Sequence, residues 1–252
     1  MVKLSVWLNG LLIPIRAAES TLARYTLPLV VINNDETYPC SLMGSSIGVK
    51  YKDYYFLLCC KHQLQNTLAG RPVRDVGLLD TDGYSLCSAG GIRFFDTIND
   101  SELHDLVVFD FTEPCNNRPK MQERFFNLQH SPPEINSDRI VTFIASGFPF
   151  KDQKYDTNEE SRSIGFAKRI ELCELAPESE QSSDKTLLRV KPLNPFNFDP
   201  DGMSGGAAFT ILLDGTTQRA YLAGMLVRAG QEDIYLLKID NILQVLDNCV
   251  KL

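Results

Sequence analysis

The sequence predicts an all-β protein built from two β-domains, which we place at residues 1–125 and 126–252, with a helix at the C-terminal end. Apolar residues fall mostly in short runs separated by turn residues, which is typical of antiparallel sheets. The pattern breaks over residues 112–138, where four prolines and an Asn-Asn pair indicate a crossing between the domains. A chain of 252 residues is long enough for each half to bury a core.

The first half contains five segments with the apolar, β-branched and aromatic composition of strands. Residues 2–12 and 27–33 are predicted as two early strands. Residues 46–51 and 54–60 are predicted as a hairpin around Lys52-Asp53, and residues 105–111 as a late strand of the same domain. These segments supply the strands of a first barrel.

The second half resumes with a predicted strand over residues 140–146, followed by Gly147-Phe148-Pro149. Further strands are predicted at 164–172, 186–191, 207–213, 221–228 and 234–239, enough to close a second barrel. The polar stretches 151–163 and 177–185 are expected to be exposed loops. Near the end, Ile242, Val245, Leu246 and Cys249 recur at helical spacing behind Asp240, which we expect to cap a helix.

The stretch Gly202-Met203-Ser204-Gly205-Gly206 places a serine between glycines, as a nucleophile needs when backbone N–H groups must approach the oxygen that it attacks. Two classes of hydrolase use such a motif, and they differ in the order of their catalytic residues. An α/β-hydrolase requires a histidine after the serine. The three histidines of this chain, His62, His104 and His130, all precede Ser204, which excludes that class.

A triad in the order histidine, aspartate, serine remains. His62 ends the apolar run 54–61, and Asp105 opens the apolar run 106–111. The spacing leaves room for closing strands of one barrel between His62 and Asp105, and for most of a second barrel before Ser204. Each motif alone has an ordinary explanation, since glycine-rich turns, core histidines and turn aspartates are all common. Together, in this order, they predict a catalytic centre.

These motifs resemble those of the chymotrypsin-like (trypsin-like) serine peptidases over most of the chain, and Gly147-Phe148-Pro149 resembles a step found in bacterial members. The resemblance implies two antiparallel Greek-key barrels and a terminal helix, with the cleft between the barrels. His62 and Asp105 would lie on the first barrel and Ser204 on the second. The chain departs from the family at Cys60-Lys61, where small residues are usual, and no cysteine follows His62 to form the bridge common in secreted relatives.

The resemblance implies a serine endopeptidase that cleaves protein substrates through an acyl-enzyme, without a metal or an organic cofactor. His62 would take the proton of Ser204 during attack and return it to the leaving amine. Asp105 would hold the required tautomer of His62 and stabilise the imidazolium. The backbone N–H groups of Gly202 and Ser204 would bind the oxyanion, and glycine at 202 lets the backbone approach without a side-chain clash.

The resemblance also implies which residues determine substrate specificity and how the oxyanion loop is kept in shape. The floor of the primary pocket would be Phe198, the sixth residue before Ser204, which suggests an apolar pocket for an uncharged side chain unless Asp199 or Asp201 reaches in. Val227, Arg228 and Ala229 would bind the substrate, and Arg228 would attract an acidic residue. Met203 stands where digestive relatives carry an aspartate that pairs with a trimmed amino terminus. The oxyanion loop is therefore expected to be held by packing, by substrate or by a regulatory partner protein.

Two alternatives stay open. The cleft of a trypsin-like fold can recognise a peptide and hydrolyse nothing, which would make the chain a binding or scaffold module. A cysteine-based hydrolase would rest on Cys60 and His62 alone. Because all three triad residues and both oxyanion positions are present, the sequence favours the serine enzyme.

Net charge and cysteine content indicate which classes of partner and which cellular compartment to expect. A net charge of −7 without a Lys/Arg cluster disfavours nucleic acid and anionic membranes as partners. Seven cysteines, an odd number without regular spacing, favour reduced thiols and hence a cytoplasmic protein. A metal site is not expected, since Cys59 and Cys60 would point to opposite faces of a strand. Asn9-Gly10, Pro14 and Arg16 interrupt the apolar start, which disfavours a signal peptide.

Overall fold

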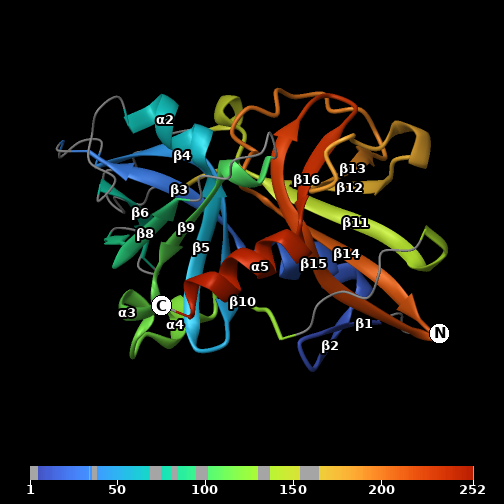
Figure 1. Cartoon of the computed structure of the whole chain (residues 1–252), viewed down its shortest axis with the longest axis horizontal. Helices are drawn as coiled ribbons and strands as arrows, with labels where there is room; N and C mark the ends of the chain where they lie inside the picture. The colour runs from blue at the N-terminus through green and yellow to red at the C-terminus, as the bar shows by residue number, and fades with distance from the viewer. Residues whose placement is uncertain are drawn as a thin grey trace.

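The computed structural model describes residues 5–33, 35, 39–68, 75–80, 85–94, 102–129, 137–153 and 165–251. It contains two eight-stranded sheets, one formed mainly by each half of the chain (Figure 1). The predicted all-β class with a C-terminal helix is confirmed. No helix among these residues is both long enough and apolar enough to cross a membrane.

Six strands of the sheet of the second half close into an antiparallel barrel, because the two outermost of these six, β14 and β15, also pair with each other. The order around the barrel is β14-β11-β12-β13-β16-β15. The strands are β11 (Ile140–Gly147), β12 (Arg169–Leu175), β13 (Leu187–Pro192), β14 (Ala207–Asp214), β15 (Thr217–Ala229) and β16 (Ile234–Lys238).

The sheet of the first half curls into a half-barrel with the order β7-β6-β3-β4-β5-β9-β8. Its strands are β3 (Thr26–Ile32), β4 (Cys40–Tyr51), β5 (Tyr54–Cys60), β6 (Val76–Leu79), β7 (Leu86–Ser88), β8 (Gly91–Phe94) and β9 (Leu106–Asp110). The predicted hairpin is confirmed as β4 and β5, with Tyr51 opposite Tyr54. Alternation along β5 sends Cys59 and Cys60 into different core clusters, as expected for neighbours on a strand.

Short helical elements connect the strands. They are η1 (Ile15–Ala17), α1 (Ala18–Ala23), α2 (Lys61–Leu68), η3 (Glu102–Asp105), α3 (Thr112–Cys115), α4 (Pro119–Gln122), η4 (Ser137–Arg139), η5 (Phe150–Asp152) and η6 (Glu178–Glu180). The predicted crossing thus contains α3, α4 and the short strand β10 (Phe126–Asn127), which pairs with β4 in parallel. The predicted loop at 151–163 lies mostly outside the described residues, as does the first residue of the predicted strand 164–172.

The prediction of one strand over residues 2–12 is wrong for the part that the structure describes. The chain forms a hairpin of β1 (Ser5–Leu8) and β2 (Leu11–Pro14), with a turn at Asn9 (φ 48°) and Gly10 (φ 82°). Positive φ at both central positions is the condition for a two-residue hairpin turn, and Asn-Gly meets it at little cost. Residues 2–4 lie outside the described residues.

The expected cap of the terminal helix is also corrected. Helix α5 (Ile239–Cys249) begins directly after β16, so its N-cap is Lys238, which is extended and makes no side-chain cap bond. Asp240 lies inside the first turn, where a carboxylate is favoured by the partial positive charge of the helix start. The predicted apolar positions Ile242, Val245, Leu246 and Cys249 are buried.

Elements near both ends of the chain contact the opposite barrel. Strand β1 pairs in parallel with β15 of the second barrel, with Val6 opposite Gln218. Figure 1 shows α5 crossing toward the first barrel, where Asp247 accepts hydrogen bonds from Tyr51 Oη and Lys52 Nζ, both at 2.8 Å. The largest core cluster accordingly draws residues from both halves. The domain boundary at residue 125 stays a prediction.

Candidate active site

His62 and Asp105 are brought together by the pairing of β5 with β9. Cys60, the last residue of β5, lies opposite Leu106, the first residue of β9. Asp105 therefore precedes its strand by one residue, and His62 follows its own strand in the first turn of α2. The two side chains meet at the same end of the first sheet.

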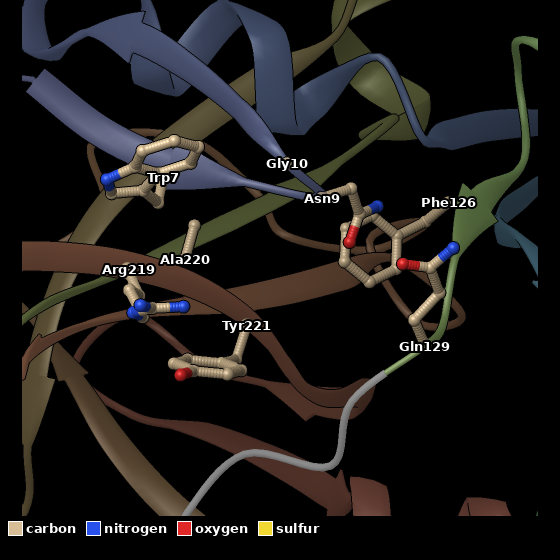
Figure 2. Close-up of a pocket in the computed structure, with 8 residues that line it drawn as sticks. All are labelled: Trp7, Asn9, Gly10, Phe126, Gln129, Arg219, Ala220 and Tyr221. Carbon is tan, nitrogen blue, oxygen red and sulfur yellow. The ribbon is translucent and has the colours of Figure 1, made fainter.

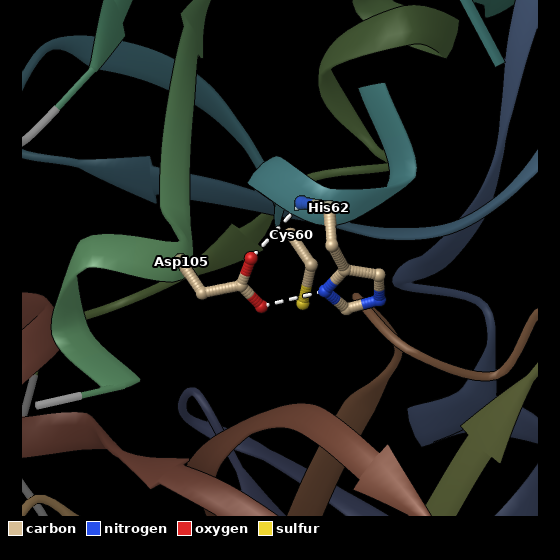
Figure 3. Close-up of side chains that lie close together, drawn as sticks. All are labelled: Cys60, His62 and Asp105. Carbon is tan, nitrogen blue, oxygen red and sulfur yellow. Dashed lines mark hydrogen bonds and ion pairs between the residues drawn. The ribbon is translucent and has the colours of Figure 1, made fainter. Parts of the chain in front are cut away.

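The carboxylate of Asp105 makes two hydrogen bonds to His62, as Figure 3 shows. Oδ2 lies 2.8 Å from Nδ1, and Oδ1 accepts the backbone N–H of His62 at 3.0 Å. Because a carboxylate only accepts, Nδ1 of the neutral ring carries the proton and Nε2 is left as the acceptor. This is the tautomer that a general base needs.

The environment favours the charged form of His62. The hydrogen bond to Asp105 raises the pKa of His62 above its ordinary value of 6.5, partial burial lowers it, and the charges of Asp105 and Glu102 raise it further. Asp105 is 8% exposed, whereas the imidazole stays accessible from a pocket. The pair can therefore stabilise an imidazolium without leaving a buried charge unpaired.

Ser204 lies on the loop between β13 and β14, three residues before β14 begins at Ala207. The N–H groups of Met203, Gly205 and Gly206 donate to the carbonyls of Pro200, Leu226 and Met203. The N–H groups of Gly202 and Ser204 have no acceptor among the residues that the structure describes. These two free donors are the ones that the sequence assigned to the oxyanion.

Gly202 and Met203 explain how this loop is shaped. Gly202 has φ +98°, and a Cβ there would lie 2.6 Å from the carbonyl oxygen of Phe148, so a side chain is excluded on both counts. Met203 is 0% exposed and belongs to the core cluster of the second barrel. The buried side chain of Met203 thus anchors the loop by apolar packing.

The hydroxyl of Ser204 points to a carbonyl in this structure. Oγ donates to the backbone oxygen of Val227 at 3.2 Å, and within the described part of the chain no hydrogen bond joins Ser204 to His62. Both residues nevertheless line one pocket of about 660 Å³. Rotation about the Cα–Cβ bond of Ser204 is the change that would redirect Oγ.

The predicted substrate residues divide between two pockets. Val227, Arg228 and Ala229 line the pocket of His62 and Ser204. Phe198 instead lines another pocket, of about 580 Å³, and stacks on Phe196 with ring centroids 4.8 Å apart. Its role as the floor of the primary pocket therefore stays a prediction that this arrangement does not favour.

Sequence reasoning missed several polar residues of the site pocket. Lys61, Glu102 and His104 line it but had been given no role there, and Asp201 was mentioned only as an acid near Phe198. Arg228 pairs with Glu102 at 3.2 Å, so this cation of the pocket already has an internal partner. Adjacency to His62 was the available signal for Lys61, whereas the contact between Glu102 and Arg228 is visible only in three dimensions.

Cys60 lies close to the pair, as Figure 3 shows, and its sulfur falls within 4.8 Å of donor atoms of His62 and Asp105. These three residues are the candidates to hold a metal in the described part of the chain. The thiol is fully buried and donates to the Leu226 oxygen at 3.5 Å. Burial, together with the charge of Asp105, raises the pKa of Cys60 well above 9.0, which disfavours both a thiolate ligand and a thiolate nucleophile.

A separate pocket of about 430 Å³ lies beside the hairpin of β1 and β2, where Figure 2 shows Trp7, Phe126, Arg219 and Tyr221 around it. It shares no lining residue with the pocket of Ser204. Among the described residues that line it there is no histidine, serine, cysteine or carboxylate residue, so Tyr221 is its candidate acid–base group.

Comparison with known proteins places the fold. No protein-family model and no curated protein matches the chain. A mutant of human heparin binding protein (CAP37) superposes with a TM-score of 0.56 at 10% identity, covering 92% of this chain and 93% of its own. Human heparin binding protein itself gives a TM-score of 0.54 at 10% identity, covering 90% and 92%. The chain therefore has the trypsin-like double-barrel fold.

Proposed function

We propose that this protein is a serine endopeptidase that cleaves protein substrates with His62, Asp105 and Ser204. The observation that carries the proposal is the shared pocket. It joins the His62–Asp105 pair, at 2.8 Å, to a serine whose own N–H and that of Gly202 are both unengaged in the described structure. A base, its orienting acid, a hydroxyl and two oxyanion donors are the groups that acyl transfer requires.

The reaction would proceed by two transfers. As Ser204 Oγ forms a bond to the substrate carbonyl carbon, Nε2 of His62 accepts the hydroxyl proton, and the carbonyl oxygen becomes an oxyanion facing the N–H groups of Gly202 and Ser204. Collapse breaks the peptide C–N bond, and His62 returns the proton to the leaving amine. Water then repeats the sequence with His62 as base, which releases the acid and restores Ser204.

A second candidate is a peptide-binding module without hydrolysis. It is favoured by one observation: Ser204 Oγ bonds to the Val227 oxygen rather than to His62. If that rotamer persisted with substrate bound, the proton could not be transferred. In apo structures catalytic hydrogen bonds are often long or unformed, so we place this candidate second.

The proposal includes a class of partner and a compartment. We expect protein or peptide substrates, and neither nucleic acid nor membrane, because the net charge is −7 and no basic cluster was found in the sequence. All seven cysteines are free thiols and buried, which accords with a cytoplasmic protein. A regulatory partner protein stays part of the proposal, because Met203 cannot make the ion pair with a trimmed amino terminus that the digestive relatives use.

A serine-directed fluorophosphonate probe separates the two candidates. The unmodified chain should be labelled at Ser204, found by peptide mapping, and labelling should be lost in Ser204→Ala and in His62→Ala. Ser20→Ala, at an exposed helical serine, serves as the matched control and should label like the parent. Binding of peptides by a parent chain that does not label would establish the second candidate instead.

A further inference from the structure

Two polar side chains of the first barrel reach the loop that carries Ser204. Gln63 follows His62 on α2, and Ser45 lies in the middle of β4. Both are buried, with 6% and 0% exposure. Because buried polar groups need partners, their hydrogen bonds show what they hold in place.

The side-chain amide of Gln63 makes three hydrogen bonds, one of which crosses to the second barrel. Oε1 accepts the backbone N–H of Cys60 at 2.8 Å, and Nε2 donates to the carbonyl oxygens of Ser204 at 2.7 Å and Ser45 at 3.1 Å. The orientation of the amide is fixed by chemistry, since an N–H needs the oxygen and two carbonyls need the NH₂ group. One side chain therefore connects the residue before Lys61-His62 with the backbone of the nucleophile.

Ser45 engages the same loop at a second point. Its Oγ donates to the carbonyl oxygen of Gly202 at 2.7 Å and accepts the N–H of Phe148 at 2.8 Å. Its own N–H reaches the Ser204 oxygen at 3.3 Å. The carbonyls of Gly202 and Ser204, on either side of Met203, are thus both anchored by the first barrel.

The neighbouring residue leaves room for this arrangement. A Cβ on Gly44 would lie 2.2 Å from Nε2 of Gln63, and Gly44 has φ +138°. Any side chain there would push the amide away from Ser204. Gly44, Ser45 and Gln63 therefore form one unit, which we call the interbarrel clamp.

Peptide planarity shows which parts of the oxyanion loop the clamp holds. In a trans peptide the C=O and N–H point in opposite directions, so fixing a carbonyl also fixes the N–H of the same plane. The plane ending at the Gly202 N–H is held by Asp201 O, which accepts from Phe150 N at 2.7 Å, and the plane ending at the Ser204 N–H by Met203 O. The interbarrel clamp holds the Gly202–Met203 and Ser204–Gly205 peptide planes, which lie on either side of the plane that carries the Ser204 N–H.

We propose that Ser45 and Gln63 are positioning residues that preform the oxyanion loop from the first barrel, without a trimmed amino terminus. The inference rests on the proposed function, and it explains how a loop with Met203 in place of an acid is kept in shape. Neither side chain touches the reacting atoms. Their contribution is to keep the Gly202 and Ser204 N–H groups aimed at one point.

The test replaces each residue beside a matched control. Gln63→Met keeps length and apolar volume but removes the three hydrogen bonds, and Ser45→Ala removes the hydroxyl. Gln181→Met is the control for the first, because Gln181 also donates to two carbonyls and accepts one N–H, and it is not among the residues that line the site pocket. Ser46→Ala is the control for the second, since Ser46 is equally buried and donates to the Leu27 oxygen.

The kinetic readout is kcat separated from KM on a peptide substrate. We expect kcat to fall by about 10²-fold in Gln63→Met and about 10-fold in Ser45→Ala, as for a displacement of ~1 Å at a catalytic group, with KM within about threefold. Both controls should keep kcat within about threefold even where Tm falls. Equal losses of kcat in the controls, or unchanged kcat in the clamp variants, would overturn the inference.

A second readout works without any activity. Hydrogen exchange followed by mass spectrometry should show faster exchange of the segment 202–206 in Gln63→Met and Ser45→Ala, by about tenfold or more, and unchanged exchange there in the controls. Should the parent chain fail to react with a fluorophosphonate, the proposed function fails, and this exchange still tests the clamp. Exchange of 202–206 equal to the parent in both clamp variants would contradict it.

Discussion

Asp105 holds His62 at two points, with Oδ2 on the ring at 2.8 Å and Oδ1 on the backbone N–H at 3.0 Å. The backbone contact fixes where the residue lies, and the ring contact fixes which nitrogen faces the pocket. Replacing the carboxylate by a neutral amide would keep the contact to the His62 backbone and disturb the contact to the ring. The first prediction follows from this difference.

Ser204→Ala and His62→Ala should each lower kcat/KM for peptide hydrolysis by about 10⁶-fold, because the triad acts as a unit. Asp105→Asn should cost about 10⁴-fold, through the wrong tautomer of His62. Asp110→Asn, at the other end of β9, changes an acid whose carboxylate accepts the Thr112 N–H, and should leave the rate within about threefold. Hydrolysis that survives Ser204→Ala unchanged would contradict the assignment.

The pH profile should report His62. Only neutral His62 can accept the serine proton, so kcat/KM should rise with pH along a limb centred above 6.5, because the hydrogen bond to Asp105 raises the pKa. Asp105→Asn should move this limb to lower pH. The same shift predicts that the charged pair stabilises the fold fully below pH 6.5 and loses that contribution as pH rises through the folded pKa. A limb at or below 6.5 in the parent would be inconsistent with the pair.

Cys60 should prove dispensable for the chemistry. Cys60→Ala is expected to retain fluorophosphonate labelling and kcat within about tenfold, the loss reflecting a buried packing change beside Asp105. Native protein should also resist iodoacetamide at this position, since the thiol is buried and its pKa lies well above 9.0. A cysteine-based hydrolase predicts the opposite result, namely loss of activity in Cys60→Ala and rapid alkylation.

Arg228 should influence which peptides are cleaved. It lines the pocket of Ser204 and pairs with Glu102, so an acidic substrate residue would compete with that pair. Arg228→Ala should lower kcat/KM for an acidic peptide by about tenfold relative to a neutral one, the equivalent of one charge-assisted hydrogen bond. Profiling with a peptide library checks this, and a strict preference for cleavage after Lys or Arg would contradict it. The library also tests the apolar preference predicted from Phe198.

Trimming the amino-terminal segment should not activate the protein. Removal of residues 1–26 deletes β1, β2 and α1, and with them Val6 and Leu22, which are both fully buried. Burying a side chain of this size contributes about 1.5–3 kcal/mol to the free energy of unfolding. Both the Tm and the activity of the trimmed chain should therefore fall. Activity assays and thermal unfolding of the same preparations measure this. A rise in activity by orders of magnitude that depends on the new amino group would contradict the view that Met203 replaces an ion pair.

Much of the fold could be predicted because its signals are local. Continuous apolar runs mark β5 and β14 directly, and helical spacing marks α5. The order of His62, Asp105 and Ser204 was equally informative, because it excludes one class and fits another. The turn at Asn9-Gly10 could also have been predicted, because Asn-Gly favours a two-residue hairpin turn. The prediction of a single strand was wrong there because it relied on the apolar residues and ignored the turn residues.

What could not be predicted depends on contacts between distant segments. Nothing in the sequence around Gln63 or Ser45 distinguishes them from ordinary surface residues, and their role follows only from the carbonyls of Gly202 and Ser204. The assignment of Phe198 to the primary pocket, made by counting back from Ser204, stays a prediction for a related reason. The loop before the serine folds so that Phe198 stacks on Phe196, and a count of residues cannot represent that turn of the chain.

The exchange of end elements between the barrels has a consequence for how the protein unfolds. Because β1 completes the edge of β15 and α5 is tied to Tyr51 and Lys52, neither half keeps its full core when the other melts. Heat or denaturant should therefore produce a single cooperative transition rather than two. A chain nicked in the crossing would remain one particle in solution, and the two halves produced as separate polypeptides would become ordered only on meeting each other.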